Sequence, residues 1–163
     1  MSFGIHDLAV GGGVLALCPM PGRRGDFAGD MARVLGWAPD LVVSMTGAGE
    51  MAAARDLPHV LARAGIGWRQ FPVGDFGVPD DAGNAAWPAL AQETRAVLAA
   101  GGRVLLHCMG GCGRSGMVAL RVMVACGEAP DAALARLRAV RPCAVETAAQ
   151  LAWASDQTEG AGA

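Results

Sequence analysis

The sequence predicts a single α/β domain in which a central, mostly parallel sheet is flanked by helices. Two observations carry this prediction. Short apolar runs of strand length alternate with helical patterns over the first two thirds of the chain, and three helical patterns then follow without an intervening strand. Such an alternation is typical of a parallel sheet covered on both faces. The 163 residues fit one compact domain with a sizeable core.

Four strands are expected where short apolar runs are bounded by turn residues. They are Val14–Leu17, Leu41–Ser44, Trp68–Val73 and Val104–His107. The last three are apolar enough for burial on both faces.

Helical spacing of apolar residues occurs between and after these strands. The expected helices are Phe27–Leu35, Pro58–Ala64, Trp87–Ala99, Ser115–Cys126, Pro130–Val140 and Val145–Asp156. Ser115–Cys126 is apolar almost all round and is expected to be a central buried helix. The C-terminal third is therefore helical. The folded domain is expected to span residues 1–158, and the small, polar residues 159–163 are expected to form a frayed tail.

Composition excludes several classes of protein. Hydrophobic residues make up 53% and charged residues 17%, with no apolar run long enough for a membrane span, so a soluble globular chain is expected. A net charge of −2 argues against a nucleic-acid binder. Met1–Val10 lacks a basic-then-apolar signal pattern, which favours a cytoplasmic setting. The five cysteines are an odd number without zinc-binding spacing, so neither a disulfide framework nor a metal site is expected.

The segment between the fourth strand and the buried helix, HCMGGCGRSG from His107 to Gly116, carries the densest chemical signal. Five residues, three of them glycine, separate Cys108 from Arg114 and can curl so that backbone N–H groups point inward and bind an anion. The substrate-binding residues of this loop are predicted to be Met109, Gly110, Gly111, Cys112 and Gly113. The following helix adds its positive dipole end, and Arg114 supplies a planar fork for two phosphate oxygens. The loop is thus predicted to bind phosphate.

A cysteine thiol in such a loop loses its proton readily, so Cys108 is expected to be a nucleophilic thiolate. Ser115 is placed to donate a hydrogen bond to the sulfur, and His107 is expected to brace the loop. The plain alternative is a glycine-rich turn without function. A metal site built from His107, Cys108 and Cys112 lacks a fourth ligand. No cofactor is predicted.

The His-Cys-x5-Arg-Ser pattern resembles the signature of the protein tyrosine phosphatase superfamily, in its small dual-specificity branch. Two more segments resemble that family: FPVGDFGVPD from Phe71 to Asp80, and RPCAVETAAQ from Arg141 to Gln150. The Gly-Gly-x-Gly-Arg-Ser loop and the Pro21-Gly22-Arg23 turn are most similar to the cyclin-dependent kinase inhibitor 3, or kinase-associated phosphatase, type. The resemblance implies a phosphomonoester hydrolase acting on a phosphorylated protein through a cysteinyl-phosphate intermediate.

The resemblance also implies roles for single residues. Asp75 is the implied general acid, with Asp80 or Asp81 as alternatives. Gln150 resembles the glutamine that orients water in the second step, although a surface glutamine is an equal alternative. Glu146 is expected to anchor that helix or the loop. Glu50 matches a glutamate that hydrogen-bonds the site, with a solvated loop residue as its alternative.

Two arginines and two cysteines are further candidates for a role at the site. Arg23 and Arg24 are candidates for a second negative group of the substrate, although exposed arginines on a turn need no function. Cys112 and Cys143 replace other residues of the family, so reversible disulfide protection of Cys108 is a hypothesis, with small buried thiols as its alternative.

Three other functions stay open. They are a phosphatase of a small phosphate ester, a rhodanese-like sulfurtransferase and a phosphate-binding module without turnover. The five-residue gap to Arg114 disfavours the sulfurtransferase, and a complete set of Cys108, Arg114 and Asp75 disfavours the non-catalytic module. The acid precedes the cysteine, which excludes the low-molecular-weight phosphatases. No membrane or nucleic-acid partner is expected.

Overall fold

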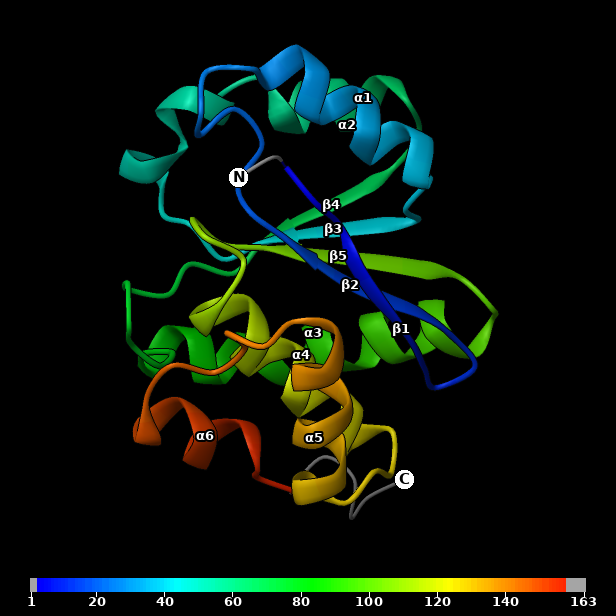
Figure 1. Ribbon diagram of the computed structural model, residues 1–163, viewed down its shortest axis with the longest axis vertical. Coiled ribbons are helices and arrows are strands. Elements are labelled where there is room, and N and C mark those ends of the chain that lie inside the picture. Colours follow the sequence, from blue (N-terminus) through cyan, green and yellow to red (C-terminus); the bar gives the residue numbers. More distant parts are fainter. Residues whose placement is uncertain (1–2, 158–163) are drawn as a thin grey trace.

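A computed structural model describes residues 3–157 and shows a five-stranded sheet with helices on both faces (Figure 1). The strands are β1 (His6–Val10), β2 (Gly13–Cys18), β3 (Leu41–Ser44), β4 (Gly67–Gln70) and β5 (Arg103–His107). Their order is β1-β2-β5-β3-β4. Only β1 pairs antiparallel, and the other neighbours are parallel, so the predicted architecture is confirmed.

Each face of the sheet packs against its own set of helices (Figure 1). One face is covered by α1 (Phe27–Trp37) and α2 (Leu57–Arg63), and the other by α3 (Asp81–Ala99), α4 (Gly113–Ala125), α5 (Pro130–Val140) and α6 (Ala148–Ala154). Alternate side chains of the strands therefore enter two separate apolar cores. A 3₁₀ helix, η1 (Ala48–Ala54), follows β3. Within residues 3–157, no helix is both long and apolar enough to cross a bilayer.

The edge strand β1 was absent from the sequence prediction. It forms a hairpin with β2 through Gly11 and Gly12, whose φ values of 60° and 97° favour glycine. A Gly-Gly pair between two short strands is a known hairpin signal. The strand itself is short and begins with the polar His6 and Asp7, so its apolar alternation covers too few residues to stand out.

The prediction for β4 was wrong in two respects. This strand ends at Gln70 rather than at Val73, and it lies at the edge of the sheet with partly exposed side chains. Beyond Gln70 the chain no longer forms a strand but still runs beside the end of β3. Two hydrogen bonds hold it there, from Phe71 N–H to Ser44 O (2.8 Å) and from Val73 N–H to Met45 O (3.1 Å). The apolar side chains of Phe71 and Val73 are buried beneath this irregular segment.

Helix boundaries differ from prediction where a side chain caps the first turn. Asp80 accepts a hydrogen bond from Gly83 N–H (2.8 Å), so α3 begins at Asp81, six residues before the predicted start. Thr147 accepts from Gln150 N–H (3.1 Å), so α6 begins after it rather than at Val145.

Helix α4 is buried along its whole length, as predicted. Gly116 lies in its first turn, and a β-carbon there would come within 2.8 Å of the Ala144 α-carbon. Only glycine allows the segment before α6 to approach α4 so closely. The loop between β5 and α4 is therefore anchored in the core at both ends.

Candidate active site

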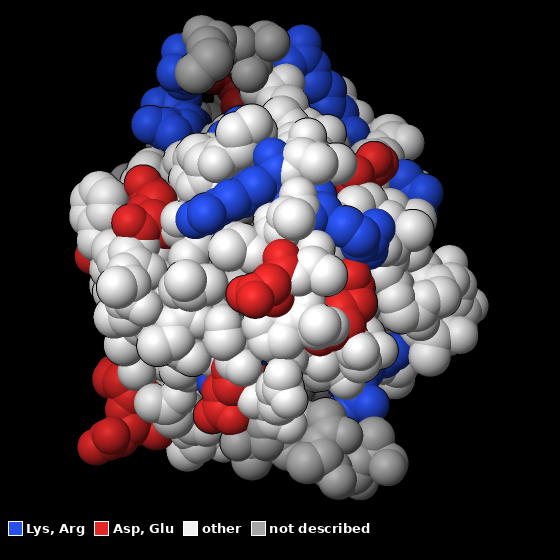
Figure 2. Space-filling model, turned by 60° about the horizontal axis from the view of Figure 1, so that its bottom comes forward, with Lys and Arg blue, Asp and Glu red and all other residues white. Residues whose placement is uncertain are grey.

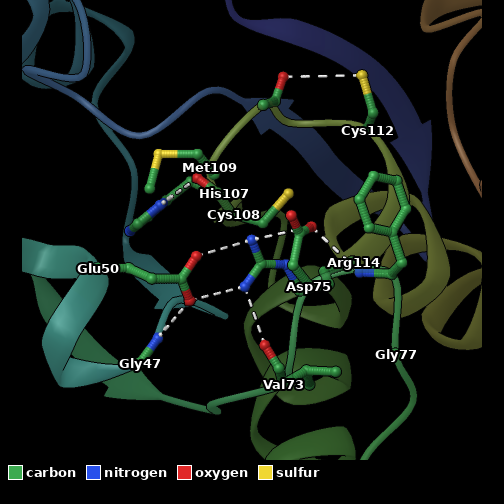
Figure 3. A network of polar contacts seen from close by, with 12 residues as sticks. Gly47, Glu50, Val73, Asp75, Gly77, His107, Cys108, Met109, Cys112 and Arg114 are labelled. Carbon is green, nitrogen blue, oxygen red and sulfur yellow. Dashed lines mark hydrogen bonds and ion pairs between the residues drawn. The ribbon is translucent and has the colours of Figure 1, made fainter.

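The reactive cysteine lies directly after a central strand. β5 ends at His107 and α4 begins at Gly113, which leaves Cys108 at the start of the connecting loop. Cys108 is 3% exposed, and its sulfur lies near the Asp75 carboxylate and the Arg114 guanidinium (Figure 3). The loop thus places a sulfur atom at the base of a polar site.

The loop, called the phosphate-binding loop below (residues 108–114), is held by its carbonyl groups from outside. Arg23 Nη1 donates to Met109 O (3.1 Å), while Arg141 donates to Gly110 O (2.9 Å) and Gly111 O (3.0 Å). Within the described chain, the N–H groups of Gly110 and Gly111 donate to no other residue. Gly111 has a φ of 72°, which favours glycine. Outward carbonyls and unpaired amides are the arrangement of an anion-binding loop.

Arg114 is fixed by a two-pronged ion pair (Figure 3). Its Nη1 and Nη2 donate to the two carboxylate oxygens of Glu50, at 2.9 and 3.0 Å, and Nη1 also donates to Val73 O (2.9 Å). Nη2 lies 3.4 Å from Asp75 Oδ1. Glu50 is itself oriented by Gly47 N–H, 3.0 Å from Oε1. The guanidinium plane is therefore set before any substrate binds.

The pKa shifts of Glu50 and Arg114 both favour the charged form of each side chain. Burial lowers the pKa of Arg114, but the hydrogen bonds that it donates to Glu50 and the nearby charges of Cys108, Glu50 and Asp75 outweigh this effect and leave the pKa raised. The hydrogen bond from Arg114 lowers the pKa of Glu50, against a smaller opposing effect of burial. The Arg114 side chain is only 1% exposed, so loss of Glu50 would leave a buried charge without its partner.

His107 lies in a buried chain of hydrogen bonds beneath the loop. Its Nδ1 lies 3.1 Å from Cys108 O, which fixes the proton on Nδ1, and its Nε2 accepts from Ser44 Oγ (2.5 Å). Trp68 Nε1 donates to the same Ser44 oxygen (2.9 Å). Burial lowers the pKa of His107 to about 4, so the ring is neutral near pH 7. This geometry agrees with the predicted bracing role.

The three candidate acids lie in different surroundings. Asp75 lies in the loop after β4, with its side chain 61% exposed and Oδ1 beside Arg114 and 3.1 Å from Phe76 N–H. Asp80 caps α3, and Asp81 is an exposed residue in its first turn. Only Asp75 forms an ion pair with Arg114 among the described acidic residues of this loop.

Gln150 is buried, so its alternative as a surface glutamine is wrong. Its Nε2 donates to Gly77 O (3.1 Å) in the loop that carries Asp75, and its Oε1 accepts from Glu146 N–H (2.9 Å) and Thr147 N–H (3.3 Å). Gln150 thus ties the acid-bearing loop to α6.

Glu146 is exposed and lies against the start of α4. A β-carbon at Gly113 would clash with Glu146 Oε1, so the glutamate side chain would have to move if any other residue stood here. The position fits the expected anchoring role at the helix and the loop.

The predicted hydrogen bond from Ser115 to the Cys108 sulfur is not formed. Ser115 Oγ is fully buried and has no hydrogen-bond partner among the described residues. Its position in the first turn of the buried α4 is set by helix packing, which the sequence pattern does not resolve. A buried hydroxyl without a partner costs free energy and marks a group that a ligand or reaction intermediate can pair.

The cysteine predictions need correction. Cys112 and Cys143 form a disulfide with each other, with their α-carbons 5.1 Å apart, so neither can pair with Cys108 in this state. Two segments 31 residues apart meet here, which spacing alone could not show. Cys108 and the buried Cys18 are free thiols. Burial, and then the nearby Cys108, raise the pKa of Cys18, which therefore stays protonated.

Sequence reasoning missed the part played by Arg141. It was recognised as the first residue of the RPCAVETAAQ segment, without a role, yet it holds two carbonyl groups of the phosphate-binding loop. The available signal was the Arg-Pro pair itself: Pro142 has no N–H to donate and favours an end to α5, so the arginine beside it lies in a loop.

Comparison with known proteins places this site in a family. Residues 12–134 match the family described as "Cyclin-dependent kinase inhibitor 3". No curated protein sequence matches the chain. A solved kinase associated phosphatase (KAP), with its catalytic cysteine replaced by serine, is 22% identical with a TM-score of 0.82 and covers 100% of this chain and 98% of its own.

Two further solved structures are similar. Tk-PTP in its active form is 28% identical with a TM-score of 0.67, over 89% of this chain and 91% of its own. A mouse putative dual specificity phosphatase is 20% identical with a TM-score of 0.67, and the match covers 96% of this chain and 89% of its own. These likenesses cover nearly the whole described domain.

Proposed function

Because the chain belongs to the cyclin-dependent kinase inhibitor 3 family and is a cysteine-dependent phosphatase of the protein tyrosine phosphatase superfamily, we propose that it dephosphorylates phosphoproteins through a phosphate ester of Cys108. One observation carries this proposal: the Cys108 sulfur lies at the base of a loop with free amides, beside an arginine that Glu50 has already oriented.

The hydrogen bonds of Arg114 support a particular position for the phosphate. Glu50 and Val73 occupy both hydrogens of Nη1 and one of Nη2. Nε and the second Nη2 hydrogen therefore remain, and together they match two phosphate oxygens. The contact of Nη2 with Asp75 is long, at 3.4 Å, so an arriving phosphate would displace the Asp75 carboxylate toward the leaving oxygen.

In the first step, the Cys108 thiolate attacks phosphorus while the bond from phosphorus to the ester oxygen breaks. Asp75 gives its proton to that oxygen, because an expelled alkoxide or phenoxide is too basic to leave unaided. The loop amides and Arg114 stabilise the charge of the transferring phosphoryl group. The alcohol leaves and phosphocysteine remains.

In the second step, water attacks phosphorus and the sulfur leaves as a thiolate, while Asp75 accepts the proton of the water. The buried, unpaired Ser115 hydroxyl donates a hydrogen bond to the departing sulfur. Gln150 acts as a positioning residue, since its Oε1 is engaged by two backbone N–H groups and its Nε2 holds the Asp75 loop through Gly77.

A phosphoprotein fits this site because the rim is open. Asp75 is largely exposed, and Phe76 beside it is 59% exposed with an aromatic ring that a protein substrate can cover. A small phosphate ester is the alternative substrate. A phosphotyrosine, phosphoserine and phosphothreonine peptide panel, run beside small phosphate esters, separates the two by kcat/KM.

The assignment of residues is tested on an aryl phosphate and the same peptides. Cys108→Ser is expected to abolish turnover, and Asp75→Asn to lower kcat by roughly 10²- to 10⁴-fold, the usual contribution of a general acid. Asp81→Asn is the matched control and should stay within about twofold of wild type, since its carboxylate lies outside the site. Normal turnover by Asp75→Asn would reassign the acid.

A further inference from the structure

The general acid of the proposed mechanism is held only weakly by its own side-chain contacts. The Asp75 side chain is 61% exposed, its carboxylate lies 3.4 Å from Arg114, and it accepts from Phe76 N–H (3.1 Å). Phe76 is the next residue in the chain and cannot fix the loop from outside. The position of the carboxylate therefore depends on what holds the backbone of the acid-bearing loop, residues 71–80, which joins β4 to α3.

The end of this loop is held by Asn84, near the start of α3. Asn84 Nδ2 donates to Pro79 O (3.2 Å), and Asn84 Oδ1 accepts from Trp153 Nε1 (2.8 Å). Asn84 occupies an exposed helix position, where alanine would favour the helix more. Its amide group connects the end of the loop to α6.

The start of the loop packs against the same tryptophan. Phe71 directly follows β4, and its ring centroid lies 6.4 Å from that of Trp153 and 5.7 Å from that of Trp87. The two tryptophans meet edge to face, with their centroids 5.0 Å apart. Aromatic pairs of this kind have a preferred geometry in addition to their buried area. Trp153 therefore contacts the start of the loop with its ring and the end of the loop through its N–H.

The Trp153 indole is held in one orientation from its other side. Arg121, in the buried helix α4, lies over this ring at 4.3 Å and donates to the Trp153 backbone carbonyl (2.9 Å). A guanidinium over the face of a tryptophan is a favourable contact. The direction of the indole N–H toward Asn84 is thus set by packing around the ring.

We propose that Trp153 is a positioning residue for the general acid and acts from α6 on both ends of the acid-bearing loop. The inference rests on the proposed function, in which Asp75 protonates the leaving oxygen. Gln150, on the same helix, holds the middle of the loop through Gly77 O (3.1 Å). The segment before α6 clamps the phosphate-binding loop. The acid and the nucleophile are therefore attached to the same part of the chain, which limits changes in the distance between them.

The dependence of rate on the leaving group tests the proposal. The value of kcat/KM reports the first chemical step, in which a strongly basic leaving group needs the acid and a weakly basic one does not. Trp153→Phe keeps an aromatic ring but removes the N–H, and Asn84→Ala removes the contact with Pro79. Each is expected to lower kcat/KM for phenyl phosphate roughly tenfold, the loss of a hydrogen bond that positions the acid, and for 2,4-dinitrophenyl phosphate by less than about twofold.

A purely structural role would give a different result, because a smaller folded fraction lowers kcat/KM for both substrates by the same factor. Trp37→Phe is the matched control, since it removes an indole N–H that donates to Asp7 (3.0 Å) from α1, on the other face of the sheet. Its ratio of the two kcat/KM values should equal that of wild type. None of the three substitutions changes a charge, so the interspersed acidic and basic side chains in Figure 2 attract an anionic substrate as before.

The double variant Trp153→Phe/Asn84→Ala tests whether the effect passes through Asn84. Both changes break the same hydrogen bond, so the loss for phenyl phosphate should equal that of Asn84→Ala alone. A loss equal to the product of the two single losses would overturn this route. An unchanged substrate ratio in Trp153→Phe would overturn the whole proposal.

Asp75→Asn separates this proposal from the proposed function. It should show a larger dependence on the leaving group than either single variant. If Asp75→Asn discriminates between the two substrates and Trp153→Phe does not, the positioning role is wrong while the phosphatase mechanism stands. If Asp75→Asn does not discriminate, the acid of the proposed function is wrong and the positioning role falls with it.

Discussion

Arg114 is the residue on which the catalytic geometry depends. Its side chain is almost entirely buried, yet its charge is kept by Glu50, whose carboxylate matches it with two hydrogen bonds. A buried arginine costs free energy unless it is fully paired. The pairing leaves one edge of the guanidinium free, and in the proposed function this edge receives the phosphate, so that the Glu50–Arg114 pair would act as a preorganised receptor.

His107 should make folding stability depend on pH. Burial lowers its pKa from 6.5 to about 4, so between these values the unfolded chain binds a proton that the folded chain does not. Stability is therefore full above about pH 6.5 and is lost as pH falls through about pH 4. Melting temperature measured between these values should fall less steeply in His107→Gln than in wild type.

His59→Gln is the control for this experiment, because His59 is exposed on α2. It should keep the wild-type pH slope. His6, whose pKa is also lowered, leaves some slope in every variant. An identical slope in wild type and His107→Gln would show that the buried ring does not control the acid limit.

Individual side chains differ in how far sequence could predict them. Cys108 and Arg114 were predicted from the spacing of the loop, and Asp75 from the resemblance to the phosphatase family. The structure brings all three side chains together. Gln150 and Arg141 depend on contacts with Gly77, Gly110 and Gly111, which lie far away in the chain. Periodicity contains no information about such pairs.

At the scale of elements, the phosphate-binding loop is clamped by the segment between α5 and α6. Arg141 holds its carbonyl groups, and the Cys112–Cys143 disulfide joins it covalently to the same segment. The loop is therefore supported from its outer side by two kinds of bond, which keeps its amides directed inward.

The disulfide should contribute to stability. Cys143→Ser under oxidising conditions is expected to lower the free energy of unfolding by about 2–4 kcal/mol, a typical value for a native disulfide. Dithiothreitol should lower wild type to the same level and leave Cys143→Ser unchanged, as measured by urea denaturation. Cys126→Ser removes a free, half-buried thiol and serves as the control. If dithiothreitol left the free energy of unfolding of the wild type unchanged, the disulfide would not be a source of stability.

Elements with strong periodicity were predicted well, and those fixed by other forces were not. Pro130–Val140 was predicted to the residue because proline starts the helix, and Leu41–Ser44 because three apolar residues in a row end at a serine. The short edge strand β1 depends on pairing with β2 more than on its own pattern. The start of α3 depends on the cap by Asp80, a local bond that apolar spacing does not report.

For the whole molecule, the sheet explains why the site lies where it does. Glu50 follows β3, Asp75 follows β4 and Cys108 follows β5, and these parallel strands end at the same edge. Ligands of open α/β sheets bind at this edge. The turn after β2 carries Arg23 to the same edge, where its guanidinium donates to Met109 O of the phosphate-binding loop.

The most direct test of this account is detection of phosphate on Cys108 during turnover. The enzyme would be mixed with an aryl phosphate, quenched in acid within the first turnover and digested for mass spectrometry. Phosphate is expected on the peptide that contains Cys108, and on no peptide from Cys108→Ser. Phosphate on another residue, or continued turnover by Cys108→Ser, would contradict the account.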